Sequence, residues 1–98
     1  MNKYESMYIL EADREDEVIA QQVEKFTQLV VENGGTIQEV KPWGKRRLAY
    51  PIQDKIDGYY VLMTFEAPAE LPQELERNFK IDENVLRYLV IRLDEKNA

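Results

Sequence analysis

The sequence predicts an α+β domain in which strands and helices follow one another in the order β-α-β-β-α-β. Two observations predict this order. Four short runs are rich in aromatic and β-branched residues, and two longer stretches repeat apolar residues at three- and four-residue spacing. Right-handed crossovers turn the order into a ferredoxin-like fold, a four-stranded antiparallel sheet with both helices on one face. We expect residues 1–98 to form one domain with a short tail at 94–98.

The first strand is predicted at residues 4–11, and the first helix at 14–33. Asp13 is expected to cap this helix, and the acidic residues 15–17 suit the positive end of the helix dipole. Apolar residues spaced three and four apart give the helix one buried face. Glycines 34–35 are expected to end it, since glycine readily adopts the left-handed conformation of a C-terminal cap.

The second strand is predicted over residues 36–52, with an interruption at 42–44. Because proline cannot donate to a central hydrogen-bond ladder, we expect this strand at a sheet edge or with a bulge. The polar connection 53–58 ends in Asp-Gly, which is typical of a hairpin turn. The third strand is predicted at 59–67.

A short helix is predicted from residue 70, with a buried stripe formed by Leu71, Leu75 and Phe79. The last strand is predicted at 85–93. The ferredoxin-like topology places the first and third strands in the centre of the sheet and the second and fourth at its edges.

Alternation along a strand assigns side chains to the two faces of the sheet. On the last two strands, the set expected to face the helices is Tyr59, Val61, Met63, Phe65, Leu86, Tyr88 and Val90. The set expected on the opposite, open face includes Tyr60, Leu62, Arg87, Leu89 and Ile91. The open face therefore carries apolar side chains that no helix of this chain covers.

The composition argues against an enzyme. The sequence contains no cysteine and no histidine, which removes the thiol nucleophile, the commonest general base and the commonest metal ligands. No metalloprotease, nucleophile-elbow or phosphate-loop motif occurs. No apolar run is long enough to span a bilayer and no signal-peptide pattern is visible, so we expect a soluble, cytoplasmic protein.

Charge is distributed unevenly along the chain, whose net charge is −6. Residues 1–40 carry a net charge of −6 and residues 54–76 a net charge of −5, whereas residues 41–53 carry +4 and residues 77–92 carry +2. Two short basic regions in an acidic chain suit a local contact with phosphate better than a broad electrostatic surface.

The first basic region holds four cations and Trp43 within residues 41–47. Such a group can supply point charges, guanidinium forks and a stacking plane for a phosphate backbone and an unstacked base. Charges on an edge strand also prevent edge-to-edge pairing, and Trp43 could instead pack over an apolar patch. The pattern alone leaves both explanations open.

The motif GxRRLAYxI at residues 44–52 resembles the signature of the family of the sixth protein of the bacterial small ribosomal subunit. Further positions agree with this family over residues 3–93. They are Tyr4-Glu5, Gly34-Gly35, Trp43-Gly44, Gly58-Tyr59-Tyr60, Leu75-Glu76-Arg77 and Asn84-Val85-Leu86-Arg87.

The resemblance implies a non-enzymatic protein without cofactor, membrane contact or small-molecule substrate. It implies binding to the central domain of 16S rRNA together with the eighteenth protein of the same subunit. A basic partner would explain how an acidic chain lies on rRNA. The sequence leaves open whether the partner uses the open sheet face or the edge of the 36–52 strand. Some family members carry a long acidic tail, whose role does not transfer to residues 94–98.

The residues that we expect to contact RNA are Lys3, Tyr4, Lys45, Arg46, Arg47, Arg87 and Arg92. The residues that we expect to contact the protein partner are Trp43, Leu48, Tyr50 and Tyr60. A core position is the alternative for Tyr4 and for Leu48. In a regular strand Arg46 and Arg47 point to opposite faces, so we do not expect them to share one role.

Two other classes of function remain as alternatives. A protein-binding adaptor with the same fold would bind no RNA, and sedimentation with small ribosomal subunits separates it from a ribosomal protein. A small acyl-phosphate hydrolase would need an anion-binding loop that the sequence does not contain.

Overall fold

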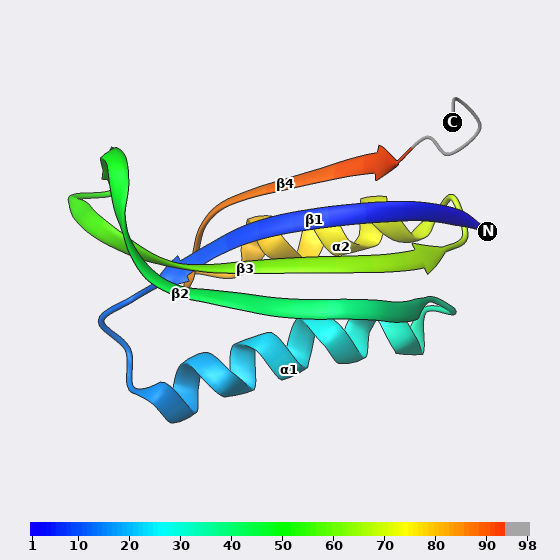
Figure 1. Cartoon of the computed structure of the whole chain (residues 1–98), viewed down its shortest axis with the longest axis horizontal. Helices are drawn as coiled ribbons and strands as arrows, with labels where there is room; N and C mark the ends of the chain where they lie inside the picture. The colour runs from blue at the N-terminus through cyan, green and yellow to red at the C-terminus, as the bar shows by residue number, and fades with distance from the viewer. Residues whose placement is uncertain (94–98) are drawn as a thin grey trace.

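The computed structural model describes residues 1–93 as a four-stranded sheet with two helices on one face (Figure 1). The elements are β1 (Asn2–Glu11), α1 (Asp16–Glu32), β2 (Thr36–Ile52), β3 (Lys55–Ala67), α2 (Leu71–Ile81) and β4 (Val85–Leu93). The strand order is β2-β3-β1-β4 and every pair is antiparallel, which confirms the predicted fold and its central strands. The predicted tail at 94–98 lies outside the described residues.

The main core lies between the sheet and the helices. The ring of Tyr8 on β1 lies 5.1 Å from that of Phe26 on α1 and 4.9 Å from that of Phe79 on α2, and the two phenylalanine rings are 4.7 Å apart, between centroids. Burying a large apolar side chain stabilises a fold by about 1.5–3 kcal/mol, so this cluster holds both helices to the sheet. Burial also raises the pKa of the Tyr8 hydroxyl above its ordinary value. The helix-facing set predicted for β3 is confirmed: Tyr59, Val61, Met63 and Phe65.

Helix α1 begins later than predicted, and Asp13 does not cap it. The cap position is Glu15, whose side chain makes no capping hydrogen bond. The Asp13 carboxylate instead accepts a hydrogen bond from Lys55 Nζ at 3.0 Å, a distant partner that local sequence does not reveal. The predicted end of the helix is confirmed, since Gly34 has a φ of 92° and the Gly35 N–H donates to the Val30 carbonyl at 2.8 Å.

Strand β2 is an edge strand with bulges, as predicted. Within residues 1–93 it pairs only with β3, and its register shifts at three places, one of them between Pro42 and Gly44. Gly44 has a φ of 88°, a conformation that suits glycine.

The hairpin predicted at residues 53–58 is confirmed, but its turn is shorter than predicted and does not include the Asp-Gly pair, which lies inside β3. The chain reverses at Gln53 and Asp54, whose φ values of 51° and 65° join Ile52 to its partner Lys55. Positive φ at both central residues is the geometry of the two-residue hairpin turn that matches strand twist. The Asp-Gly pair misled the prediction because its glycine serves packing inside β3 and not a turn.

The prediction that Leu86 faces the helices is wrong. The register of β1 with β4 shifts between Ile9 and Leu10, so that Leu86 is an extra residue and Val85 takes the helix-facing position. Leu86 packs on the open face with Ile9 and Leu48, and we call these three residues the open-face cluster.

The remaining predictions for β4 are confirmed. Tyr88 and Val90 pack against the main core, while Arg87, Leu89 and Ile91 are exposed on the open face.

Candidate nucleic-acid interface

Strands β2 and β3 extend beyond the end of β1 as a long twisted hairpin, of which residues 47–57 form the part that we call the hairpin arm (Figure 1). Leu48 of the arm packs in the open-face cluster and is 6% exposed. Tyr50 accepts a hydrogen bond from Arg87 Nη1 on β4, and the Arg87 guanidinium carbon lies 5.7 Å from the centre of the Tyr50 ring. Apolar packing and a cation–π contact therefore tie the arm to the far side of the open face.

The three cations of the signature motif are divided between the two faces. Arg46 lies opposite Gly58 and Arg47 opposite Asp57, so successive side chains point to opposite sides of the sheet. Arg46 Nε donates to the Trp43 carbonyl at 3.4 Å, and Arg47 Nε lies 3.6 Å from Asp57 Oδ1. Lys45 lies on the same side as Arg47, and all three cations are exposed.

A second basic group lies at the other end of β1. Lys3 is on the open face, whereas Arg92 pairs with Tyr4 and so lies on the helix side, where its Nη2 donates to Asn2 Oδ1 at 3.0 Å. The position of Lys3 is six residues along β1 from the partner of Arg87, which corresponds to about 20 Å. The two basic groups are thus too far apart for one phosphate to bridge them.

Two of the predicted contact residues lie in the core. Tyr4 is 6% exposed, its ring centroid lies 5.7 Å from that of Phe65, and its hydroxyl accepts a hydrogen bond from Asn2 Nδ2 at 3.3 Å. The buried ring of Tyr4 has no open face on which a base could stack, so we do not propose Tyr4 as an RNA contact. Leu48 is buried to the same extent, and the core explanation holds for it too.

The remaining partner candidates are accessible. Trp43 is 44% and Tyr50 is 55% exposed, while Tyr60 is half-buried against the open-face cluster. Leu89 and Ile91 were not among the predicted partner residues, yet they are 61% and 41% exposed on the open face. The alternation of side chains along β4 had already placed both residues on that face, so the sequence pattern was sufficient to identify them as partner candidates.

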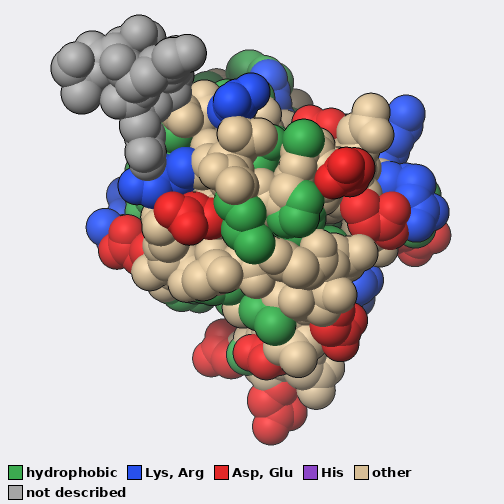
Figure 2. Space-filling view, turned by 90° about the vertical axis from the view of Figure 1, so that its right-hand side faces the viewer, with side chains coloured by type: hydrophobic (Ala, Val, Ile, Leu, Met, Phe, Trp, Pro, Cys, Tyr) green, Lys and Arg blue, Asp and Glu red, His purple; other side chains and the backbone are tan. Residues whose placement is uncertain are grey.

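Helix α1 is acidic, in contrast to these two basic groups. Helix α1 carries four carboxylates and one cation, Lys25, whose Nζ lies 2.8 Å from Asp82 Oδ2. Figure 2 shows acidic and no basic side chains at the lower tip, on the side of the molecule where α1 lies in Figure 1. Phosphate is repelled from this helix, so an anionic ligand is directed away from α1 and toward the sheet.

Two carboxyl groups have lowered pKa values because each accepts a hydrogen bond from a nearby cation. The hydrogen bond from Lys55 lowers the pKa of Asp13, and the hydrogen bond from Arg77 lowers that of Glu74. Residues 1–93 contain no group of three side chains suited to hold a metal ion, and none of their helices is long and apolar enough to cross a membrane.

Comparison with known proteins gives consistent matches along the chain. The family described as ribosomal protein S6 matches residues 3–92. Small ribosomal subunit protein bS6 of Thermoanaerobacter pseudethanolicus is 52% identical over 95 residues, which cover 97% of this chain and 100% of that protein. The protein of the same name from Caldanaerobacter subterraneus is 50% identical over 95 residues, with the same coverage.

A solved structure agrees with the fold. The crystal structure of 30S ribosomal protein S6 from Thermotoga maritima matches with a TM-score of 0.90 and 28% identity, over 94% of this chain and 87% of that chain. The chain therefore belongs to the ribosomal protein S6 family and is a structural, non-enzymatic component of the small subunit of the cytoplasmic ribosome.

Proposed function

We propose that the chain binds the central domain of 16S rRNA cooperatively with the eighteenth protein of the small subunit. The observation that carries this proposal is the composition of the open sheet face. This face combines exposed apolar side chains with cations at both ends, while the helix α1 opposite is acidic. A face of this kind can serve a protein and an RNA at once.

The cations at the two ends are the proposed RNA contacts. Arg46 and Arg87 lie on the open face near the hairpin arm, and Lys3 lies on the same face at the other end. Lys45, Arg47 and Arg92 lie on the helix side, at the rims of the sheet, where a phosphate backbone that passes around an edge could reach them.

The apolar residues between the cations are the proposed protein contacts. Leu89 and Ile91 on β4 are exposed beside Arg87, and Tyr60 lies on the same face two strands away. Tyr50 extends this surface along β2, and Trp43, exposed at the register shift of β2, is a further candidate. A basic partner that covers the apolar area would add positive charge beside the cations of this chain, so each ligand would favour binding of the other.

Sedimentation of the native protein tests the ribosomal assignment directly. In a sucrose gradient of a cell lysate, we expect the chain in the small-subunit fractions, and ribonuclease treatment should release it. Recovery of the chain only at the top of the gradient would contradict RNA-dependent assembly and favour a protein-binding adaptor.

The partner surface is tested by a matched pair of substitutions. Leu89→Asp places a carboxylate in the proposed apolar contact and should reduce binding of the eighteenth protein at least tenfold, because an unpaired charge would be buried. Val31→Asp introduces the same change at an exposed position on α1, where Val31 is 48% exposed, and should leave binding unchanged. Isothermal titration with the eighteenth protein measures the affinity of both variants. An equal loss of affinity in the two would refute the assignment of the open face as the partner surface.

A further inference from the structure

We infer that the groove between α1 and the β2–β3 pair binds an extended, basic protein segment that carries one aliphatic side chain between two cations. This groove is separate from the open face, since it lies on the helix side of the sheet. The inference does not depend on the ribosomal partner proposed above.

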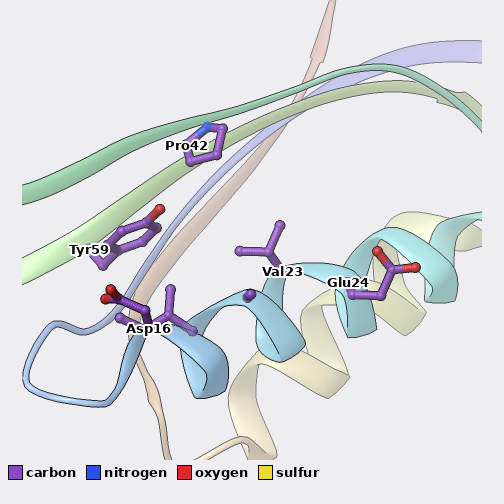
Figure 3. Close-up of a pocket in the computed structure, with 7 residues that line it drawn as sticks. Asp16, Val23, Glu24, Pro42 and Tyr59 are labelled. Carbon is purple, nitrogen blue, oxygen red and sulfur yellow. The ribbon is translucent and has the colours of Figure 1, made fainter.

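The floor of the groove is apolar and comes from two layers. Ile19 and Val23 of α1 face the sheet, and Pro42 of β2 and Tyr59 of β3 lie across from them. Figure 3 shows Val23 pointing from the helix toward Pro42, with Tyr59 at one end. The groove has a volume of about 280 Å³, which accommodates an aliphatic side chain.

Two local features keep the groove open. Ala20 lies on its helix wall, where a longer side chain would cover the floor. On the sheet wall, the register of β2 shifts next to Pro42, and proline has no N–H with which to pair. The apolar floor is therefore accessible from solvent.

The rim of the groove is negatively charged. Asp16 and Glu24 lie four residues before and four residues after Ala20, on the same side of the helix and about 12 Å apart along its axis. Neither carboxylate forms an ion pair with another of residues 1–93. An apolar groove with an unpaired carboxylate at each end attracts cations and repels phosphate, so it selects a basic protein segment over RNA.

The cations next to the groove do not neutralise this rim: Lys25 pairs with Asp82 and Lys41 with Glu39. Lys45 lies opposite Tyr59 in the β2–β3 register, but it lines the neighbouring hollow together with Asp13 and Asp57. The same hollow is also lined by Asp54 and Lys55, so three carboxylates face two ammonium groups there and Lys45 adds no excess positive charge beside the groove.

The spacing of the carboxylates determines the conformation of the bound segment. In an extended chain, residues i, i+2 and i+4 project from one face, and i and i+4 are about 13 Å apart. This distance matches the separation of Asp16 and Glu24, with the middle side chain placed above the apolar floor. In a helix, residues i and i+4 are only about 6 Å apart and would miss one of the carboxylates.

A peptide titration of the full chain tests the inference. The probe is the peptide acetyl-Gly-Lys-Thr-Leu-Thr-Lys-Gly-amide. Its binding is measured by two-dimensional NMR of the ¹⁵N-labelled protein. We expect millimolar binding with shifts confined to residues around the groove, among them Ala20, Val23 and Tyr59. A control peptide with leucine moved next to the first lysine turns that side chain away and should bind at least fivefold more weakly.

Substitutions in the protein provide the second arm. Ala20→Lys should abolish binding, because the new ammonium covers the floor and pairs with Asp16 and Glu24; lysine is a good helix former, so the fold should persist. Gln73→Lys adds the same charge at an exposed position on α2 and should bind like the wild type. Asp16→Asn and Glu24→Gln should each weaken binding about two- to fivefold.

Three results would overturn the inference. One is the absence of shifts at the groove with a few millimolar peptide, and another is equal binding by Ala20→Lys and the wild type. The third is a single-stranded RNA that shifts the groove residues more strongly than the peptide does. Retention of the wild-type shift pattern away from position 20 establishes that each variant is folded.

Discussion

Arg87 links two parts of the molecule that are far apart in the sequence. Its guanidinium donates to the hydroxyl of Tyr50, 37 positions earlier, and lies over the same ring. The side chain still remains exposed, so it can also contact a ligand. Arg87 is therefore positioned by the hairpin arm at the place where we expect RNA.

Replacement of Arg87 by alanine should weaken RNA binding and lower its salt dependence. One phosphate contact contributes about one unit to the slope of log affinity against log salt concentration. We expect this loss when the rRNA central-domain fragment is titrated at several salt concentrations with the protein partner present. Arg77→Ala on α2, where Arg77 pairs with Glu74, is the control that should leave the slope unchanged. An unaltered slope in Arg87→Ala would mean that Arg87 does not touch phosphate.

Asp82, the residue directly after α2, links the two helices. Its carboxylate accepts hydrogen bonds from Lys25 Nζ at 2.8 Å, from the Asn84 N–H at 2.9 Å and from Gln22 Nε2 at 3.3 Å. Burial acts to raise the pKa of Asp82, but the hydrogen bonds from Lys25 and Asn84 outweigh it, and the net pKa is lowered.

A lowered pKa in the folded state makes the contribution of Asp82 to stability depend on pH. The contribution is present above the pKa of the unfolded chain, about 3.9, and is lost as pH falls through the lower folded value. Asp82→Asn should thus reduce the free energy of unfolding by about 1–3 kcal/mol at pH 7 and by less at pH 2–3. Urea denaturation at both pH values measures this, and an equal loss at both would show that ionisation of Asp82 is unimportant.

The packing of the hairpin arm on the open face depends on Gly58, which the sequence pattern had assigned to a turn. A Cβ on Gly58 would lie 2.4 Å from Ile9 Cγ2 and 3.1 Å from Leu48 Cδ2, so Gly58 allows the arm to pack on the open face.

Gly58→Ala should therefore destabilise the protein by about 1–3 kcal/mol through overpacking. Gly44→Ala meets no atom within 4 Å and should cost only about 1 kcal/mol, through its positive φ. Urea denaturation compares the two variants. A larger loss of unfolding free energy in Gly44→Ala than in Gly58→Ala would contradict this prediction, because it would show that the residues around Gly58 move aside easily.

The strands and helices could be predicted because their signals are local. Periodicity and the proline at 42 identify the elements and the edge strand, and topology rules then order the sheet. The position of Leu86 could not be predicted, since a bulge reverses the alternation and its cause lies in the pairing with β1. The turn at residues 53–54 lacks glycine, so composition did not reveal it.

The candidate site was predictable in part. The cations and their alternation follow from the sequence, including the opposite directions of Arg46 and Arg47. The contact between Tyr50 and Arg87 could not be foreseen, because it depends on how the arm curls over the sheet. The same holds for the burial of Tyr4, whose ring could have faced either side of a strand.

Charge is distributed unevenly over the whole molecule. The helix α1 is acidic, and the exposed cations of the signature motif and of β4 lie on or around the sheet. An acidic protein with this distribution is expected to approach RNA with the sheet and its rims and not with α1. The open face alone offers few phosphate contacts, so we expect tight RNA binding to require the cations of a partner.

Titration of the rRNA central-domain fragment with and without the eighteenth protein tests this account most directly. The account predicts weak binding by the chain alone and, at the same salt concentration, at least about a fivefold gain when the partner is present, which is the lower end of typical coupling between sites. Equal affinity with and without the partner would contradict it.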